Sequence, residues 1–421
     1  MFVQIPWIGG NRWTNLGHLA QIYIKTGKTV DFSCESRIIF SYKKQMSVEE
    51  KHSAEGEGNQ MSKLRVGILG ATGMVGQRFI ALLENHPWFE VVTVAASARS
   101  AGRTYEEAVG DRWKMTGPMP ETVKKLVVKN VSDVEEVAST VDFVFSAVDM
   151  TKEEIKAIEE AYAKTETPVV SNNSAHRWTE DVPMVVPELN PEHLALLETQ
   201  KKRLGTTRGF IVVKPNCSIQ SYTPMLMALK EFGPKEVVAT TYQAISGAGK
   251  TFKDWPEMVD NVIPYIGGEE EKSEQEPLRI MGRVVDGKIE KAVLPVITCQ
   301  CLRVPVSDGH TAAVFVKFEK KPTKEQILKA WKDFKGLPQE LKLPSAPEQF
   351  ITYFEEENRP QAKLDRDSEK GMGVFAGRLR EDTVYDYKFV GLSHNTKRGA
   401  AGGAVLIAEL LKAQGQITAK N

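Results

Sequence analysis

One cysteine of this chain lies in a stretch whose residue types suit a nucleophile. The segment Lys214-Pro-Asn-Cys217-Ser-Ile-Gln220 follows apolar residues 210–213, a run typical of a buried parallel strand. Residues 222–232 carry apolar side chains at helical spacing, so Cys217 is expected at a strand-to-helix turn. Unpaired backbone N–H groups at a helix start favour a thiolate over a thiol. A lone cysteine is more often an inert small hydrophobe, so a nucleophile needs partners.

Two candidate partners lie further along the chain. Arg303 precedes His310 in the run Arg303-Val-Pro-Val-Ser-Asp-Gly-His310, and a turn there can direct both into one pocket. A core histidine and a surface arginine are the alternatives. Beside Cys217, however, the pair suits an aldehyde dehydrogenase that works through a thioester. The thiolate would attack a carbonyl, His310 would move protons, and Arg303 would hold a carboxylate through two hydrogen bonds.

A glycine-rich turn predicts a nucleotide site. Residues 64–69 are expected to form a strand and residues 75–83 a helix. Between them stands Gly70-Ala-Thr72-Gly73-Met74-Val75-Gly76. Glycines in this position let the backbone approach a pyrophosphate that lies on the helix N-terminus. An ordinary tight turn is the alternative, but the strand and helix on either side favour a dinucleotide site.

The segment after the second expected strand, residues 90–96, indicates which dinucleotide binds. NAD-selective sites usually have an Asp or Glu here for the ribose 2′-OH. This chain has Ser97, Arg99 and Ser100 instead, which are small polar groups with one guanidinium suited to a 2′-phosphate. The segment therefore favours NADP over NAD.

The order of the expected elements predicts an α/β chain. Strands and helices alternate up to Cys217, as in a doubly wound parallel sheet, and the chain is β-rich beyond it, as in an α+β domain with a large mixed or antiparallel sheet. A small-residue helix over 404–411 is expected to return to the nucleotide domain. The remaining expected strands are residues 126–128, 142–148, 168–171, 237–245, 289–298, 302–306, 311–318, 350–354, 374–379 and 385–392, and the remaining helices 151–164 and 324–334.

Composition excludes several classes of protein. The 421 residues include 55 Lys and Arg and 55 Asp and Glu, so zero net charge argues against nucleic acid or a membrane surface as a partner. No apolar run approaches the roughly 20 residues of a membrane span. Four cysteines do not make a disulfide framework, so a cytoplasmic location is expected. The histidines and cysteines lack metal-ligand spacing, so no metal is expected.

Seven ordered motifs carry a family resemblance. They are Gly70–Gly76, Asn216–Ser218, Gln243–Gly249, Gly268–Lys272, Arg303–His310, Arg359–Arg366 and Ser393–Gly402. With them the chain, from Leu64 to its end, resembles aspartate-β-semialdehyde dehydrogenases of the fungal and archaeal branch. The resemblance implies NADP-dependent reductive dephosphorylation of β-aspartyl phosphate to aspartate β-semialdehyde and phosphate, in the biosynthesis of lysine, threonine and methionine. It also implies a homodimer or homotetramer.

The resemblance further implies two domains and a set of site residues. A Rossmann-type NADP-binding domain would comprise residues 61–216 with 393–421, and a catalytic and dimerisation domain residues 217–392. By the family pattern Cys217 is the nucleophile, Gln243 orients the acyl group and His310 is the acid and base. Predicted substrate-binding residues are Arg303 for the α-carboxylate, Glu269 for the amino group, Lys272 and Lys114 for phosphate, and Asn216. Ser246, Gly247, Gly249 and Asn395 would lie beside the nicotinamide, while Gly70, Thr72, Gly73, Met74, Val75, Gly76, Ser97, Arg99 and Ser100 would hold the rest of NADP.

Two stretches depart from the fungal pattern. Lys214-Pro stands before Asn216 where fungal members are nearer to Ser, and residues 273–279 read Ser-Glu-Gln-Glu-Pro277-Leu-Arg. Pro277 is expected to end or kink a helix there.

Malonyl-CoA reductases, which share fold and thiol chemistry, are the alternative activity, because residues 186–190 and 341–347 resemble them. Retention of Cys217, Gln243, Arg303 and His310 together argues against a non-catalytic NADP-binding protein.

The first 60 residues differ from the rest of the chain. Residues 43–60 are polar and rich in Glu, Gly and Ser, which is typical of a disordered extension. The segment has no apolar core for a secretory signal, and its acidic residues argue against a transit peptide.

A chain that begins at Met61 is therefore expected to fold and to keep full activity. The comparison is of melting temperature and kcat with those of the full chain. A large fall in either on truncation would show that the first 60 residues serve the fold or the site.

Overall fold

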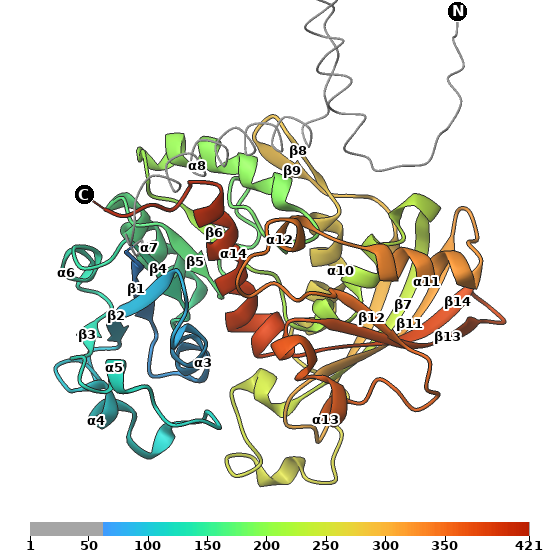
Figure 1. Ribbon diagram of the computed structural model, residues 1–421, viewed down its shortest axis with the longest axis horizontal. Helices are drawn as coiled ribbons and strands as arrows, with labels where there is room; N and C mark the ends of the chain where they lie inside the picture. Colours follow the sequence, from blue (N-terminus) through green and yellow to red (C-terminus); the bar gives the residue numbers. More distant parts are fainter. Residues whose placement is uncertain (1–61, 421) are drawn as a thin grey trace, which may run out of the picture. The chain divides into compact units, whose positions relative to one another are not determined.

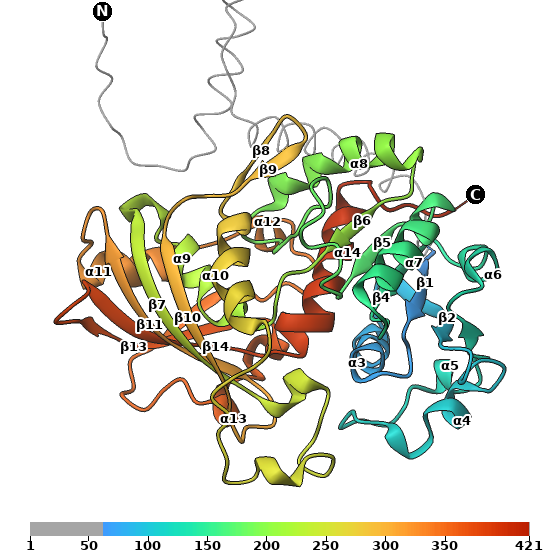
Figure 2. The same ribbon diagram turned by 180° about the vertical axis from the view of Figure 1, so that it is seen from behind.

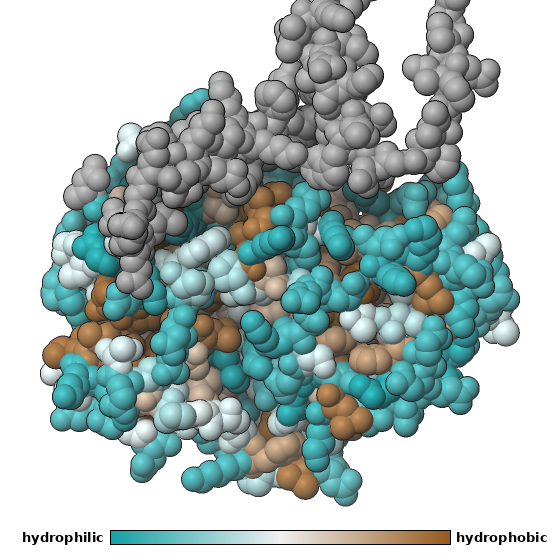
Figure 3. All heavy atoms as spheres, viewed as in Figure 1, coloured by the Kyte–Doolittle hydropathy of each residue, from teal (hydrophilic) through white to brown (hydrophobic). Residues whose placement is uncertain are grey.

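The structure is a computed structural model that describes residues 62–420. Met61–Asn421 form a compact unit of their own. The expected N-terminal extension and Cys34 lie outside the described residues. In residues 62–420 no helix is long and apolar enough to cross a membrane. Hydrophilic residues cover much of the described surface on the face drawn in Figure 3.

Six parallel strands form the first sheet, in the order β3-β2-β1-β4-β5-β6 (Figure 1). This is the strand order of a doubly wound dinucleotide-binding fold, and it confirms the predicted Rossmann-type sheet. The bounds are β1 Leu64–Leu69, β2 Phe89–Ala96, β3 Lys129–Asn130, β4 Phe143–Ser146, β5 Val169–Ser171 and β6 Ile211–Val213.

Helices cover this sheet on both faces, so every residue of β4, β5 and β6 is buried. Helices α3 (Met74–Leu83) and α14 (Gly402–Ala413) share one apolar core with β1. Helix α7 (Lys152–Lys164) contributes to a second core. The C-terminal helix thus returns to the first sheet, as predicted. The other helices of this part are α4 Tyr105–Val109, α5 Glu121–Lys124, α6 Val134–Ala138 and α8 Leu196–Leu204.

The second sheet is mixed, in the order β10-β7-β11-β14-β13-β12 (Figure 2). Its outer pairs β10–β7 and β12–β13 are parallel and the inner pairs antiparallel, which confirms the predicted large mixed sheet. Helices α10 (Glu269–Ile280) and α11 (Lys324–Asp333) join its inward side chains in one core. The bounds are β7 Pro234–Gln243, β10 Val296–Arg303, β11 His310–Phe318, β12 Ile351–Phe354, β13 Val374–Glu381, β14 Tyr387–Ser393, α12 Leu337–Glu340 and α13 Ala362–Asp365.

Two expected strands differ in their bounds from the strands of the structure. In place of 126–128, strand β3 lies at Lys129–Asn130, and a single bridge joins Val127 to Thr104. The expected strand 289–298 is interrupted because Pro295 has no N–H to donate. Its first part is β9 (Lys288–Glu290), which pairs with β8 (Arg283–Val285) around Asp286 and Gly287. Both turn residues have positive φ, of 49° and 75°, and Asp-Gly is the hairpin signal that was missed.

The structure has no separate strand over residues 302–306 and no single helix over residues 222–232, so both of these predictions are wrong. Strand β10 ends at Arg303, two residues before Pro305, which also lacks an N–H. After Cys217 the chain forms a 3₁₀ turn, Ser218–Ser221, the short helix α9, Thr223–Met227, and a second 3₁₀ turn, Lys230–Phe232. These pieces are too short to supply the strong helix dipole expected at the thiol.

Helix α10 runs through Pro277 to Ile280, so the predicted end of the helix at this proline is wrong. A proline cannot donate to the carbonyl four residues earlier, here that of Ser273. The hydroxyl of Tyr222, which is fully buried, donates to that carbonyl instead. A side chain therefore replaces the hydrogen bond that Pro277 removes, and the helix continues.

Replacing Tyr222 by Phe is expected to lower the free energy of unfolding by about 1–3 kcal/mol, because the Ser273 carbonyl then has no donor. In a Pro277→Ala background residue 277 regains an N–H, so the same replacement should cost less. The free energies are measured by denaturant unfolding. An equal loss in both backgrounds would contradict this account of the helix.

Candidate active site

A cavity of about 350 Å³ is lined by residues that follow strands of both sheets. Residues after β5 and β6 of the first sheet face residues at the ends of β7 and β10 of the second. Open parallel sheets bind ligands at the carboxyl ends of their strands. Ten of the predicted site residues line the cavity: Val75, Asn216, Cys217, Gln243, Ser246, Gly247, Glu269, Lys272, Arg303 and Asn395.

The half-buried thiol of Cys217 contacts the ring of His310, the first residue of β11. The Cys217 Sγ and the His310 Nε2 are 3.4 Å apart. On the other side of this buried ring, the backbone N–H of Ala244 donates to Nδ1 at 3.0 Å. Because Nδ1 accepts, a neutral ring carries its proton on Nε2, which faces the sulfur. His310 is thus a hydrogen-bond donor to Cys217.

Burial favours the neutral form of this pair. Burial, followed by the charge of Arg303, lowers the pKa of His310 to about 3. Burial and then the charge of Glu269 raise the pKa of the Cys217 thiol, against the opposing effects of the nearby cations. These cations are Lys214, Arg177 and Arg303. Near neutral pH the pair is a thiol beside a neutral imidazole, because an imidazolium would place a second N–H against that of Ala244.

Adjacent strands place Arg303 and Gln243 at one edge of the cavity. The two residues are paired in the register of β10 and β7, and both are buried. Arg303 donates from Nη1 to the carbonyl of Ala244 at 2.8 Å. A Cβ on Gly247 would lie 2.8 Å from that nitrogen and 3.2 Å from the His310 ring. Glycine at this position therefore allows the loop to pass over both reactive side chains.

The first turn of α10 supplies a carboxylate and an ammonium group. Lys272 and Glu269 form an ion pair of 2.8 Å, and the Asn216 amide donates to both Glu269 oxygens at 3.1 and 2.9 Å. Burial raises the pKa of Glu269, but the Lys272 charge and the hydrogen bonds outweigh it, so the net pKa is below the usual value. Glu269 is therefore a carboxylate at neutral pH.

The glycine turn has the geometry that a close-approaching phosphate requires. Gly70 has φ of 79°, and a Cβ there would lie 2.2 Å from the Ala147 oxygen. A Cβ on Gly76 would lie 2.3 Å from the Gly70 oxygen. Gly73 caps α3, and its exposed backbone leads into the first turn, with Thr72, Met74 and Val75 half-buried around it. The turn and the ten-residue helix α3 thus fit a dinucleotide.

Several predicted residues lie outside the cavity. Ser97 and Arg99 are exposed at the carboxyl end of β2, with Ser100 buried beside them. Lys114 donates to both oxygens of Asp254 at 2.8 Å, so the structure does not bring it to Cys217. Gly249 is exposed at the end of the loop that holds Ser246.

Asn395 ties this loop to the chain before His310. Its amide donates to the Ser246 hydroxyl at 2.9 Å, and its oxygen accepts the Gly309 N–H at 2.8 Å.

The cavity also contains residues that the sequence interpretation missed. Lys214 and Arg177 are buried beside Cys217, and the buried Asn172 Oδ1 has no hydrogen-bond partner among the described residues. Glu276 lies behind the cavity, seven residues after Glu269, so helical spacing could have placed it on the same face of α10. Nothing in the sequence signals Arg177, which is far from Cys217 along the chain.

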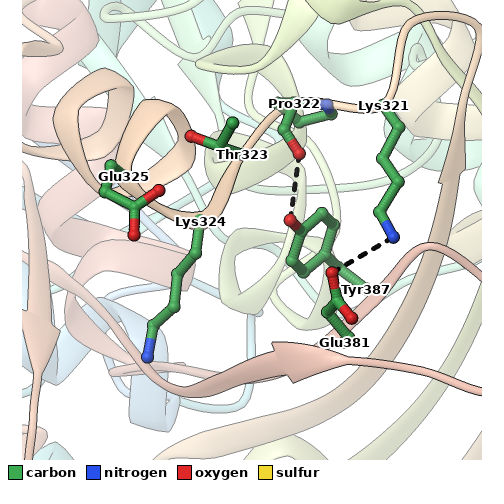
Figure 4. Close-up of a pocket in the computed structure, with 7 residues that line it drawn as sticks. All are labelled: Lys321, Pro322, Thr323, Lys324, Glu325, Glu381 and Tyr387. Atoms are coloured by element: carbon green, nitrogen blue, oxygen red, sulfur yellow. Dashed lines mark hydrogen bonds and ion pairs between the residues drawn. The ribbon is translucent and has the colours of Figure 1, made fainter.

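A second hollow, of about 500 Å³, lies at the start of α11 (Figure 4). The Tyr387 hydroxyl donates to the Pro322 carbonyl at 3.0 Å, and Lys321 pairs with Glu381 at 3.2 Å. Its lining residues include neither a cysteine nor a histidine. The reactive groups are those around Cys217.

Comparison with known proteins first defines the class. Residues 65–197 match the model of the semialdehyde dehydrogenase NAD binding domain, and residues 226–398 that of the semialdehyde dehydrogenase dimerisation domain. Fold, cavity and both matches make the chain a semialdehyde dehydrogenase.

The particular family follows from individual relatives. The chain is 44% identical over 351 residues to aspartate-semialdehyde dehydrogenase of Methanothermobacter thermautotrophicus, covering 83% of this chain and 99% of that protein. It is 42% identical over 364 residues to that of Saccharomyces cerevisiae, covering 83% and 98%. The crystal structure of aspartate semialdehyde dehydrogenase with NADP from Candida albicans matches with a TM-score of 0.76 at 39% identity, covering 85% and 100%. The chain belongs to the aspartate-semialdehyde dehydrogenase family, which confirms the resemblance.

The tautomer of His310 generates a prediction for the reactivity of Cys217. Gln can still donate to the sulfur but cannot take up its proton, whereas Ala can do neither. His310→Gln should keep the rate of Cys217 alkylation by iodoacetamide within about threefold of the wild type. His310→Ala should lower it about ten- to a hundredfold, the effect of one hydrogen bond to a charged group. Equally slow Gln and Ala variants would mean that His310 removes the thiol proton.

Proposed function

We propose that this chain is an NADP-dependent dehydrogenase that converts β-aspartyl phosphate to aspartate β-semialdehyde and phosphate through a thioester on Cys217. The observation that carries the proposal is the 3.4 Å contact of His310 with Cys217, which lines a cavity together with Arg303 and Glu269. The names of the relatives support the substrate. The product would serve amino-acid biosynthesis.

The cavity can recognise each charged group of the substrate. The planar guanidinium of Arg303, with its paired N–H donors, suits the α-carboxylate of the substrate, and the carboxylate of Glu269 suits the substrate's ammonium group. Lys272, which already lines the cavity, is the group for phosphate. These contacts would fix the acyl carbon over Cys217, and such positioning contributes much of the catalysis of acyl transfer. Gln243, held at 3.2 Å from Glu269, is placed to orient the acyl oxygen.

The residues of the chain can then carry the reaction. The Cys217 sulfur attacks the acyl carbon as a thiolate, the sulfur–carbon bond forms, the carbon–oxygen bond to phosphate breaks, and the proton lost by the thiol ends on the departing phosphate. Bound NADPH supplies the hydride that reduces the thioester. The carbonyl re-forms as the sulfur leaves as a thiolate. The Nε2–H of His310 stabilises the sulfur both as nucleophile and as leaving group, which is the acid half of its predicted role.

The cofactor is held by the first sheet in this proposal. The Gly70–Gly76 turn receives the pyrophosphate, and Arg99 the 2′-phosphate, while the loop from Ser246 to Gly249 and Asn395 lie towards the nicotinamide. The solved relative with NADP supports the choice of cofactor. The division into an NADP-binding and a catalytic domain at residues 216 and 393 is part of the same proposal.

Assembly and location complete the proposal. The outward side of the second sheet exposes Val296 and Tyr242, by 63% and 38%, and suits a homodimer or a pair of dimers. The match to a dimerisation domain supports this face. Cys299 and Cys301 are free thiols with sulfurs 3.8 Å apart, which suits a reducing cytoplasm.

One pair of assays tests the activity. NADP reduction with aspartate semialdehyde plus phosphate is compared with NADPH oxidation by malonyl-CoA. We expect the first to dominate, and faster turnover of malonyl-CoA would assign the chain to the alternative activity.

Replacing Arg99 by Ala should weaken NADP binding about ten- to a hundredfold and leave NAD binding nearly unchanged. The reason is the loss of a charge-assisted contact to the 2′-phosphate, about 1.5–3 kcal/mol. Both affinities are measured by fluorescence titration. Equal losses for the two nucleotides would mean that Arg99 holds the loop rather than the phosphate.

A further inference from the structure

The backbone that carries the nucleophile leaves its sheet before it reaches Cys217. The N–H of Lys214 still donates to Ser171 of β5 at 3.0 Å, but Pro215 has no N–H and the following residues belong to no strand. Lys214 and Asn216 are 3% and 5% exposed. Backbone polar groups buried in this way need partners from side chains, because neither water nor a neighbouring strand can supply them.

One buried ion pair supplies two of these partners. Arg177 donates from Nε to the Lys214 carbonyl at 3.1 Å and from Nη1 to Glu276 at 2.9 Å. The other oxygen of Glu276 accepts the N–H of Asn216 at 2.5 Å. The loop and the ion pair thus form a closed ring around Pro215. Arg177 is 6% exposed and Glu276 0%.

The ring joins the loop to elements on both sides of the cavity. Glu276 projects from the same face of α10 as Glu269, which Asn216 contacts through its side chain. Arg177 ends the segment that begins with Asn172 after β5 and lines the cavity. The position of Cys217 is therefore tied to the carboxylate expected to bind the substrate ammonium group and to the edge of the first sheet.

We propose that the Arg177–Glu276 ion pair is a positioning device for Cys217, which holds the nucleophile loop at the distance from Arg303 that the bound substrate requires. The proposal rests on the proposed function, because it concerns the step in which Cys217 attacks. Charge-assisted hydrogen bonds are about twice as strong as neutral ones, and the planar fork of arginine fixes two of them in direction. This makes the pair suited to fixing a backbone.

Three other roles for the pair lead to different results. If it only stabilised the fold, its loss would lower stability without a specific effect on turnover. If it acted only through charge, removing the Glu276 charge would leave Arg177 to favour the thiolate, and alkylation would become faster. If Arg177 bound the phosphate of the substrate, its loss would raise the KM for phosphate.

The first test is Glu276→Gln, which keeps the shape and removes the charge. We expect kcat for aspartate semialdehyde to fall at least tenfold, with its KM and the Kd for NADP within about threefold of the wild type. Alkylation of Cys217 by iodoacetamide should also stay within about threefold, since a small reagent needs no fixed geometry. Wild-type turnover is measured first: its absence overturns the proposed function, whereas unchanged kcat in the variant overturns only the positioning role.

Glu409 provides a matched control. It is likewise 0% exposed, pairs with His86 at 2.9 Å and accepts the backbone N–H of Ser345 at 3.0 Å, but it lies outside the cavity. Glu409→Gln should lower the melting temperature to a similar degree and leave kcat unchanged. An equal fall of kcat in both variants would contradict positioning and indicate general destabilisation.

Arg177→Lys keeps the proposal testable even if Glu276→Gln does not fold. Lysine retains the charge beside Glu276 but cannot bond both Glu276 and the Lys214 carbonyl in the same fork. We expect a kcat loss of about fivefold or more, with the KM for phosphate unchanged. A rise in that KM with kcat preserved would overturn the positioning role and assign Arg177 to phosphate. Faster alkylation with unchanged kcat in either variant would overturn it in favour of a charge effect.

Discussion

The hydrogen bonds that hold the backbone of residues 214–216 are the constraint on which the rest of the site depends. The thiol must stand in a cavity between two sheets, so its chain has to leave β6 while still buried. Helix α10 supplies Glu276 to this backbone and Glu269 to the Asn216 side chain. The helix in turn continues past Pro277 because the Tyr222 hydroxyl bonds the free carbonyl. Tyr222 follows the nucleophile by five residues, so the segment that α10 positions also completes α10.

Desolvation decides the protonation of the reactive groups. Burial lowers the pKa of His310 to about 3 and that of Lys214 to about 7, in both cases by disfavouring the cation. His310 is therefore neutral throughout the physiological range, and its fixed tautomer presents N–H to the sulfur. Lys214 loses its charge as pH rises through about 7, which removes one of the cations that favour the thiolate. The helix dipole, which the sequence suggested as the source of thiolate stability, contributes little, because only a short 3₁₀ turn follows Cys217.

Much of the fold and of the candidate site could be predicted from the sequence, for reasons that differ between residues. The strand–glycine–helix pattern from Leu64 predicted the first sheet because its signals are local. Cys217, Arg303 and His310 were predicted because their residue types limit the chemistry, and Gln243 was predicted from the family motif. Register pairing of β7 with β10 brings Gln243 and Arg303 together. Arg177 was not found, because a single arginine carries no periodic signal and its partner is distant in the chain. Pro277 was misjudged, because a local rule cannot include a hydroxyl that arrives from another segment.

The central claim is that Cys217 carries the acyl group of the substrate. The most direct measurement is peptide mass spectrometry after mixing the full chain with aspartate semialdehyde and NADP in the absence of phosphate. The account predicts an aspartyl adduct on the Cys217 peptide. Phosphate or hydroxylamine should remove this adduct, and the Cys217→Ser variant should not form it. An adduct on Cys299 or Cys301, or turnover with no adduct on Cys217 at any time, would contradict it.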